Sequence, residues 1–355
     1  GKHKQALKYN KKAFDVYTHL ERPLNEAAII HNLATSFKNL GDQKEALSYF
    51  QKSLDIKKEY GDRLLQASSY GQIWNVQLEI GNYSEAINYL KRSLAIYRDF
   101  GHYFNEGLAT LIVIEAYIEI GQFDDAKNLI DQAESILEEY KDPTIKGLIL
   151  TYRGTIEFYE SNSDAAISHL ESSIEQFQIA QKSEQAFQAY LLLIQIFIHI
   201  QKFSQAEKIL DKIKSHEKKV QSEEFLLRAA ALRIFILALN DKEITEAYKE
   251  RIKNDEVEIR DYFSYWYIAL AYSLKDDELN AKEYLIKAQN LLKEKGEKDS
   301  NKSYWDTILN TNPINKHIIA QDEKSVKEFT DSLKKETVKV EISKFCTECG
   351  YSNVS

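Results

Sequence analysis

The residues best suited to chemistry in this sequence are its two cysteines, Cys346 and Cys349, which are followed at once by Gly350. Two thiolates at this spacing in a tight turn can bind one metal ion, but a structural zinc site needs four ligands. The chain has no third cysteine, and His317 lies too far upstream to be a good partner. The pair therefore indicates either half of a zinc site, completed by residues beyond Ser355 or by another chain, or a free or redox-active pair in a tail.

The segment before the cysteines has the pattern of a strand. Val338, Val340 and Ile342 alternate with polar neighbours between Thr337 and Ser343. A strand that leads into C-x-x-C-G resembles the first knuckle of a zinc ribbon, and this resemblance implies zinc as the ligand. A thioredoxin-like role fits less well, because no βαβ pattern surrounds the pair.

Other catalytic patterns are missing from the sequence. It contains no phosphate-binding glycine loop, no H-E-x-x-H motif, no nucleophile elbow and no kinase signature. The eight histidines are scattered, and we expect His31, His102, His169 and His199 to be groove or packing residues. We therefore expect no enzyme activity, and no cofactor apart from zinc at the cysteine pair.

The overall composition restricts the partners. The chain has 47 basic and 55 acidic residues, mixed along its length, for a net charge of −8. Nucleic-acid binding needs a basic stripe, and none is visible. No apolar run reaches membrane-spanning length, and two cysteines in 355 residues fit a reducing compartment. We therefore expect a cytoplasmic protein that binds neither nucleic acid nor membranes.

One repeated pattern dominates the sequence. A G-x-x-x-x-A signature returns every 40 residues, and the same frame then continues with the glycine replaced. Its six copies are Gly1/Ala6, Gly41/Ala46, Gly81/Ala86, Gly121/Ala126, Ser161/Ala166 and Gln201/Ala206. A fixed period of this size predicts a stack of identical structural modules.

Each module reads as two helices joined by a turn. Apolar residues recur at helical spacing from Glu26 to Leu40 and again from Lys44 to Tyr60. Between these segments Gly41 tolerates the left-handed conformation that ends a helix, and Asp42 can cap the next one. One such hairpin cannot bury its own apolar face, so neighbouring hairpins must stack.

The residues of these modules resemble a tetratricopeptide repeat of the 40-residue variety. The matching positions in one copy are Leu33, Ala34, Phe37, Gly41, Ala46, Phe50 and Ser53. The resemblance covers roughly residues 1 to 295 and implies an all-α fold, a right-handed α-solenoid of about seven to eight hairpins. The alanines of the signature are expected where two helix backbones approach closely.

The repeat frame also predicts the domain organisation. We expect the solenoid over residues 1–296, a capping helix and linker over 297–321, and a charged helix, strand and C-x-x-C-G tail over 322–355. The register weakens after the sixth unit, with a seventh unit around Ala247 and an eighth over 262–295. Because the chain opens on the turn and second helix of a repeat, we expect it to be part of a longer polypeptide.

The resemblance also implies where a partner binds. In this family, contacts come mainly from the exposed side of each first helix, which lines a concave groove. The corresponding residues are Asn32, Thr35, Gln72, Asn75, Ile112, Glu115, Tyr152 and Gln195. The amides suit the backbone of an extended peptide, whereas Ile112, Tyr152 and Leu192 either offer apolar contacts or pack inside a tight superhelix. Only Lys38 and Arg153 approximate the family's carboxylate clamp, so we expect no binding of a free C-terminal carboxylate.

These features favour a non-catalytic scaffold that binds a protein or peptide through the groove. The alternative is a ligand- or peptide-sensing regulatory arm of a larger signalling ATPase or transcription regulator. A third hypothesis is action on phosphorylated response regulators, which in related proteins uses an N-terminal helical bundle; here the repeats begin at Gly1. Open ends of the solenoid also permit self-association.

Overall fold

The computed structural model describes residues 2–244, 261–297, 306, 309, 312–320 and 326–334. All regular structure in these residues is helical and arranged in successive hairpins, which confirms the predicted α-solenoid. The chain divides into two compact units. Unit 1 comprises Gly1–Arg153 and Lys295–Ile308, and unit 2 comprises Gly154–Glu294 and Leu309–Ser355.

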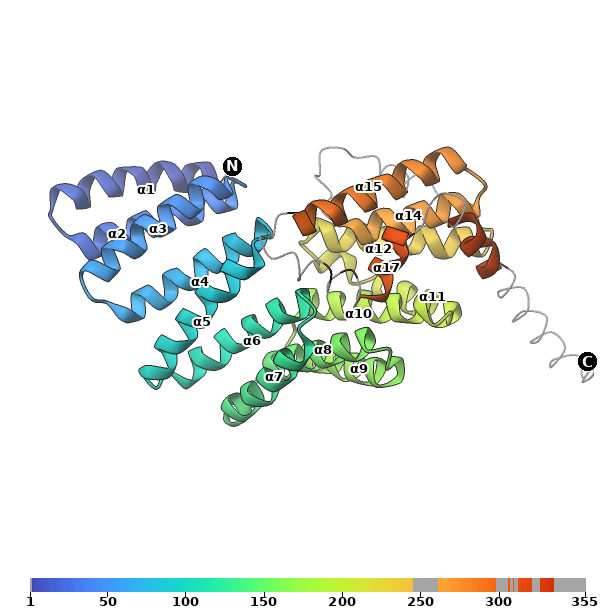
Figure 1. Ribbon diagram of the computed structural model, residues 1–355, viewed down its shortest axis with the longest axis horizontal. Coiled ribbons are helices and arrows are strands. Elements are labelled where there is room, and N and C mark those ends of the chain that lie inside the picture. Colours follow the sequence, from blue (N-terminus) through green and yellow to red (C-terminus); the bar gives the residue numbers. More distant parts are fainter. Residues whose placement is uncertain are drawn as a thin grey trace, which may run out of the picture. The chain divides into compact units, whose positions relative to one another are not determined.

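Unit 1 is a run of hairpins in which each helix from α1 to α7 packs on the one before it (Figure 1). Helix α8, Pro143–Tyr159, begins in unit 1 and continues into unit 2. The earlier elements are α1 (Lys2–His19), α2 (Pro23–Asn39), α3 (Gln43–Glu59), α4 (Arg63–Glu79), α5 (Tyr83–Asp99), α6 (Tyr103–Glu119), α7 (Phe123–Leu137) and a 3-10 turn (Glu138–Tyr140). Helices α2, α4 and α6 are the first helices of their repeats, and α3, α5 and α7 are the second helices.

The turns explain why the helices end where they do. Gly41 has a φ of 82°, a conformation that glycine adopts without steric cost. The next residue caps the following helix, because the Asp42 carboxylate accepts a hydrogen bond from the Glu45 backbone N–H at 3.2 Å. Ser161 and Gln201, which replace the glycine, have φ values of 66° and 59° and so keep the same left-handed turn.

Small residues and large apolar residues alternate in the core, as expected. The signature alanines Ala46, Ala86, Ala126, Ala166 and Ala206 are all fully buried, at 0% exposure. A second contact recurs in two hairpins: Ser53 Oγ donates to the Ala27 carbonyl at 2.7 Å, and Ser93 Oγ to the Ala67 carbonyl at 2.9 Å. In both, a hydroxyl on the second helix donates to a backbone carbonyl of the first helix.

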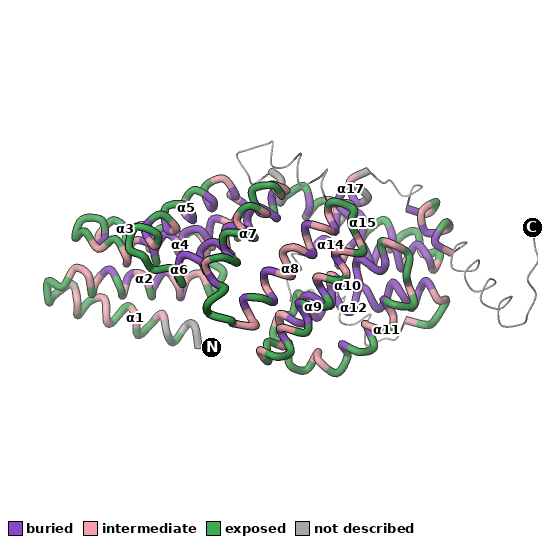
Figure 2. The backbone as a smooth tube through the Cα atoms, turned by 90° about the horizontal axis from the view of Figure 1, so that it is seen from below, coloured by how far each residue is buried: buried purple, intermediate pink, exposed green. Residues whose placement is uncertain are grey.

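Unit 2 continues the same architecture. Its elements are α9 (Ser163–Ile179), α10 (Ser183–His199), α11 (Phe203–Ile213), a 3-10 turn (Glu217–Lys219), α12 (Glu223–Leu239), α14 (Tyr262–Leu274), α15 (Glu278–Glu297), α17 (Pro313–Ala320) and a helix over 326–334. Helix α12 packs on α10, α11 and α14. Helices α9 and α11 alternate between buried and exposed residues, as amphipathic elements do, whereas α12 and α14 are buried along most of their length (Figure 2).

Several predictions lie outside the described residues. These are the strand over 337–343, the pair Cys346 and Cys349, and the seventh unit around Ala247. The zinc half-site and the domain boundaries therefore stay predictions. Among the described helices, none is both long enough and apolar enough to cross a membrane.

Candidate functional site

The predicted contact residues of unit 1 lie on the first helices and keep access to solvent. We call the surface formed by Asn32, Thr35, Gln72, Asn75, Ile112 and Glu115 on α2, α4 and α6 the first-helix face. Asn32 and Glu115 are exposed, and the other four are half-buried, as is Tyr152 on α8. Their neighbours in sequence, such as Leu33 and Ile73, point into the core at 2% and 0% exposure.

A lysine joins two helices across the first-helix face. Lys38 Nζ on α2 donates to Asn75 Oδ1 on α4 at 2.9 Å and to Gln72 Oε1 at 3.4 Å. Because both amide oxygens accept from Lys38, the amide NH₂ groups of Gln72 and Asn75 are the parts left to donate outward. The sequence placed these residues on one surface but did not predict the bridge.

The other candidate for a carboxylate clamp is engaged elsewhere. Arg153 forms ion pairs with Asp131 at 2.9 Å and Glu134 at 2.7 Å, both on α7. Lys38 instead serves the amides of α4. The two cations therefore have separate partners, which agrees with the expectation that they do not act together.

The α6 end of the first-helix face is less polar and carries an unusual carboxyl group. Desolvation by the surrounding protein, followed by the like charge of Glu119, raises the pKa of Glu115 to about 7, although the residue retains exposed surface. Desolvation, followed by the charge of Glu115, also raises the pKa of Tyr152 well above its ordinary value. Together with Ile112 these groups form a patch whose charge changes near neutral pH.

At the α2 end, some predicted groups are occupied within the fold. Thr35 Oγ1 donates to the His31 carbonyl at 3.0 Å, one helical turn earlier. Asn10 Nδ2 on α1 donates to the Asn32 carbonyl at 3.3 Å, which leaves the Asn32 side chain outside this bond. Asn32 is therefore better placed than Thr35 to contact a partner.

Two basic groups lie beneath the first-helix face. The His31 ring contacts Phe50 edge-on with centroids 5.0 Å apart, and burial, followed by the charges of Lys57 and Lys38, lowers its pKa to about 4. Lys57 is only 3% exposed, and its Nζ donates to Ser69 Oγ at 2.7 Å. Burial lowers the pKa of Lys57 to about 8. His31 is thus an uncharged packing residue at neutral pH, as the sequence suggested.

Comparison with known proteins agrees with the repeat geometry. A family model described as tetratricopeptide repeat matches residues 1–59 and, in an overlapping second match, residues 25–99. The first 99 residues therefore match a tetratricopeptide-repeat family. No curated protein matches the chain by sequence.

Solved structures resemble this chain over most of its length. The apo form of the quorum sensor NprR from B. thuringiensis is 17% identical, with a TM-score of 0.61 over 81% of this chain and 83% of that one. Aspartyl phosphate phosphatase F from Bacillus subtilis is also 17% identical, with a TM-score of 0.62 over 78% and 73%. NprR in complex with its cognate peptide NprX is 15% identical, with a TM-score of 0.57 over 82% of this chain and 84% of that one. At these identities the likeness shows a shared fold.

In unit 2 the predicted contact residue is buried. Gln195 on α10 is buried, at 4% exposure, and its Nε2 has no hydrogen-bond partner among the residues described. Tyr267 on α14 is also buried, at 2% exposure. Burial raises the pKa of Tyr267, and a hydrogen bond with the Gln195 side chain opposes that rise. The repeat frame therefore places Gln195 at the right helical position, but its side chain is not presented to a partner.

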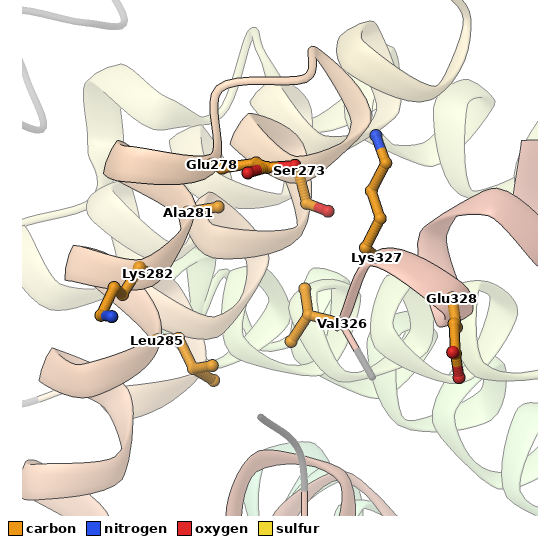
Figure 3. A pocket seen from close by; sticks show the side chains of 8 residues that line it. All are labelled: Ser273, Glu278, Ala281, Lys282, Leu285, Val326, Lys327 and Glu328. Carbon is orange, nitrogen blue, oxygen red and sulfur yellow. The ribbon is translucent and has the colours of Figure 1, made fainter. Parts of the chain in front are cut away.

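Unit 2 also contains a pocket of about 440 Å³ between α15 and the helix over 326–334. Figure 3 shows its lining side chains: Ser273, Glu278, Ala281, Lys282, Leu285, Val326, Lys327 and Glu328. The hydroxyls of Ser273 and Thr330 lie 3.0 Å apart and help to hold the two sides together, as does the ion pair of Lys327 with Asp276. The lining contains two acidic residues, Glu278 and Glu328, and two basic residues, Lys282 and Lys327. Its charge therefore favours neither an anionic nor a cationic ligand.

Proposed function

We propose that this protein binds a segment of another protein, or a peptide, across the first-helix face of unit 1 and performs no chemical step. The observation that carries the proposal is the bridge from Lys38 to Gln72 and Asn75. It fixes the oxygens of two neighbouring, half-buried amides and leaves their NH₂ groups to donate outward. Preorganised donors reduce the entropy lost when a partner is ordered on them.

The bound segment is best matched by an extended chain with apolar anchors. The NH₂ groups of Gln72 and Asn75 suit backbone carbonyls, as in other modes of peptide recognition in which main-chain hydrogen bonds provide affinity. Ile112 and Tyr152 offer half-exposed apolar surface one and two repeats further along. A net charge of −8 argues against nucleic acid as the partner. We also propose a cytoplasmic location.

A second function is a sensing arm of a larger regulator, in which a small ligand or short peptide occupies the same face. It is favoured by the shared fold with a quorum sensor that has been solved with its cognate peptide. The two functions differ in the size of the ligand. A short synthetic peptide that raises the thermal stability of the chain supports the sensing arm, whereas retention of a folded protein supports the scaffold.

The fold is also shared with an aspartyl phosphate phosphatase, but we propose no catalysis here. Gln195 is buried and the Gln72 amide is held by Lys38, so neither is placed as a free catalytic group. Dephosphorylation of a phosphorylated response regulator by this chain, lost on replacing Gln72, contradicts this part of the proposal.

The proposal is tested by affinity capture from a lysate of the source organism. The bait is the parent chain beside a variant carrying Asn32→Ala, Asn75→Ala and Tyr152→Ala. A matched control carries Asn88→Ala, an exposed asparagine on the second helix α5. We expect a protein retained by the parent and the control and lost by the triple variant. Equal retention by all three baits contradicts the proposal.

A further inference from the structure

Large apolar residues stand exposed at one position of four successive repeats. Leu20, Tyr60, Phe100 and Tyr140 follow one another every 40 residues, at exposures of 58%, 52%, 47% and 41%. The first three directly follow α1, α3 and α5, and Tyr140 ends the turn after α7. Single exposed apolar residues are common in proteins, but recurrence at one repeat position is not expected by chance.

These residues lie along one edge of unit 1, where each second helix turns into the next first helix. Figure 1 shows the turns after α1, α3 and α5 following one another along this edge, at the left and lower left. The first turns of the next helices add further exposed apolar residues, Leu65, Tyr103 and Phe104. We call Leu20, Tyr60, Leu65, Phe100, Tyr103, Phe104 and Tyr140 together the apolar edge.

Contacts join neighbouring turns over the part of the apolar edge from Arg63 to Tyr140. The rings of Phe104 and Tyr140 lie with centroids 4.9 Å apart, and the Arg63 guanidinium stands over Phe100 at 5.6 Å. The next repeat, in unit 2, has the small residue Ala180 at the equivalent position. Contiguous exposed apolar surface of this kind marks an interaction site.

We propose that the apolar edge is a self-association surface on which two copies of this chain pair antiparallel about a two-fold axis. Four equally spaced residues are self-complementary in that arrangement. An axis between Tyr60 and Phe100 sets Tyr60 against the partner's Phe100 and Leu20 against the partner's Tyr140. Such an isologous interface closes after two copies and leaves no apolar edge exposed for further association.

The charges beside the apolar edge fit the same axis. Arg63 and Asp99 flank its centre, form an ion pair at 2.7 Å within the chain, and are each about half exposed. The two-fold axis brings Arg63 to the partner's Asp99. Further out, it sets Arg22 against the partner's Asp142. A parallel arrangement sets each of these residues against its own copy and is opposed by like charges.

The size of the apolar edge also suits a dimer. A fully covered aromatic side chain buries about 150–250 Å². At roughly half exposure, seven large side chains offer on the order of 600 Å² per chain, against about 800 Å² per partner in a standard interface. The flanking charged residues extend the area toward that value.

The first experiment measures the mass of the whole chain in solution by sedimentation over a concentration series. We expect a dimer for the parent, and a monomer for the variant Tyr60→Ser, Phe100→Ser with an unchanged helical circular dichroism spectrum. The matched control is Leu279→Ser, because Leu279 is 78% exposed but belongs to unit 2 and is not a residue of the apolar edge. A monomeric parent at every concentration overturns the proposal, and so does a dimer that survives both serine substitutions.

A charge exchange separates pairing between chains from the ion pair within one chain. Arg63→Glu alone sets two carboxylates against each other at the axis, because the partner's Asp99 is unchanged. Asp99→Arg alone sets two guanidinium groups against each other, because the partner's Arg63 is unchanged, so each variant by itself is expected to be monomeric. An equimolar mixture of the two variants restores opposite charges on both sides of the axis and is expected to form a heterodimer. If the mixture stays monomeric while the parent dimerises, the antiparallel axis is wrong.

The inference is independent of the proposed function. The apolar edge shares no residue with the first-helix face, so serine substitutions there leave partner binding by each chain unchanged. Conversely, Asn75→Ala leaves the dimer intact. Each proposal therefore fails or stands on its own variant.

Discussion

A glycine inside helix α6 gives a sharp test of the packing described for unit 1. A Cβ placed on Gly107 meets Leu137 of α7, with Cγ and Cδ2 both at 2.5 Å and Cδ1 at 2.9 Å. Leu137 is itself 3% exposed and has little room to move. The same change at Gly71 in α4 meets nothing within 4 Å. The two glycines are therefore a matched pair that differ in their surroundings.

The opposing effects have known sizes. Replacing glycine by alanine inside a helix stabilises it by about 1 kcal/mol. Overpacking a close contact costs about 1–3 kcal/mol. We therefore expect Gly71→Ala to raise the free energy of unfolding by up to about 1 kcal/mol. Gly107→Ala is expected to lower it by about 1–2 kcal/mol, because the clash outweighs the gain in helix propensity.

The assay is urea unfolding followed by circular dichroism. A double-mutant cycle assigns the cause, because Leu137→Ala removes the three atoms that the new Cβ meets. In that background, Gly107→Ala is expected to become neutral or stabilising. If Gly107→Ala stabilises the parent as much as Gly71→Ala does, the contact between α6 and α7 is wrong.

Further predictions concern turns, core and titration. Gln201→Gly is expected to raise stability by about 1 kcal/mol in urea unfolding, because Gln201 has a φ of 59° that costs a residue with a Cβ; no gain contradicts the left-handed turn. Ala126→Leu is expected to cost about 1–3 kcal/mol by overpacking a fully buried site, and an unchanged melting temperature refutes the repeat register. Folding lowers the pKa of His31 from 6.5 to about 4. The free energy of unfolding is therefore expected to be unaffected by His31 above pH 6.5 and to fall by up to about 3 kcal/mol as the pH drops to 4. His31→Gln removes this pH dependence. Glu115 has a pKa of about 7, so a partner that covers it with an apolar anchor is expected to bind more weakly as the pH rises through 7. Titration calorimetry measures this affinity against pH, and with Glu115→Gln the affinity is expected not to change with pH.

The helices and turns were largely predictable because they depend on local sequence. The expected helix over 26–40 is α2, Pro23–Asn39, and that over 44–60 is α3, Gln43–Glu59. Glycine, a capping aspartate and helical spacing of apolar residues act within a few positions of one another. The 40-residue period then repeats the result, including the turns at Ser161 and Gln201 where the glycine is absent.

The candidate site was only partly predictable, because its details depend on contacts between repeats. The period placed Gln72 and Asn75 on one surface, but the distance from Lys38 depends on how far α2 and α4 stand apart. Gln195 occupies the same repeat position as Asn75, yet it is buried in unit 2. The repeat period predicts where a side chain lies on its own helix. It does not predict whether a helix later in the chain covers that side chain.

The recurrence of the apolar edge is present in the sequence, but its exposure is not. Leu20, Tyr60, Phe100 and Tyr140 recur with the period of the repeat, next to turn residues where polar side chains are usual. Helical spacing alone does not show whether such residues are buried by the next hairpin. Their exposure in the structure distinguishes the two cases.

The most direct test of the central claim is site-specific photo-crosslinking to a partner captured by the parent chain. A photoreactive amino acid replaces Thr35 on the first-helix face in one variant and Asn88 on the second helix α5 in another, so the amides of Gln72 and Asn75 stay in place. We expect the variant at position 35 to crosslink to the partner and the variant at position 88 to give none. Crosslinking from position 88 but not from position 35 contradicts the account, because the partner then lies on the second helices.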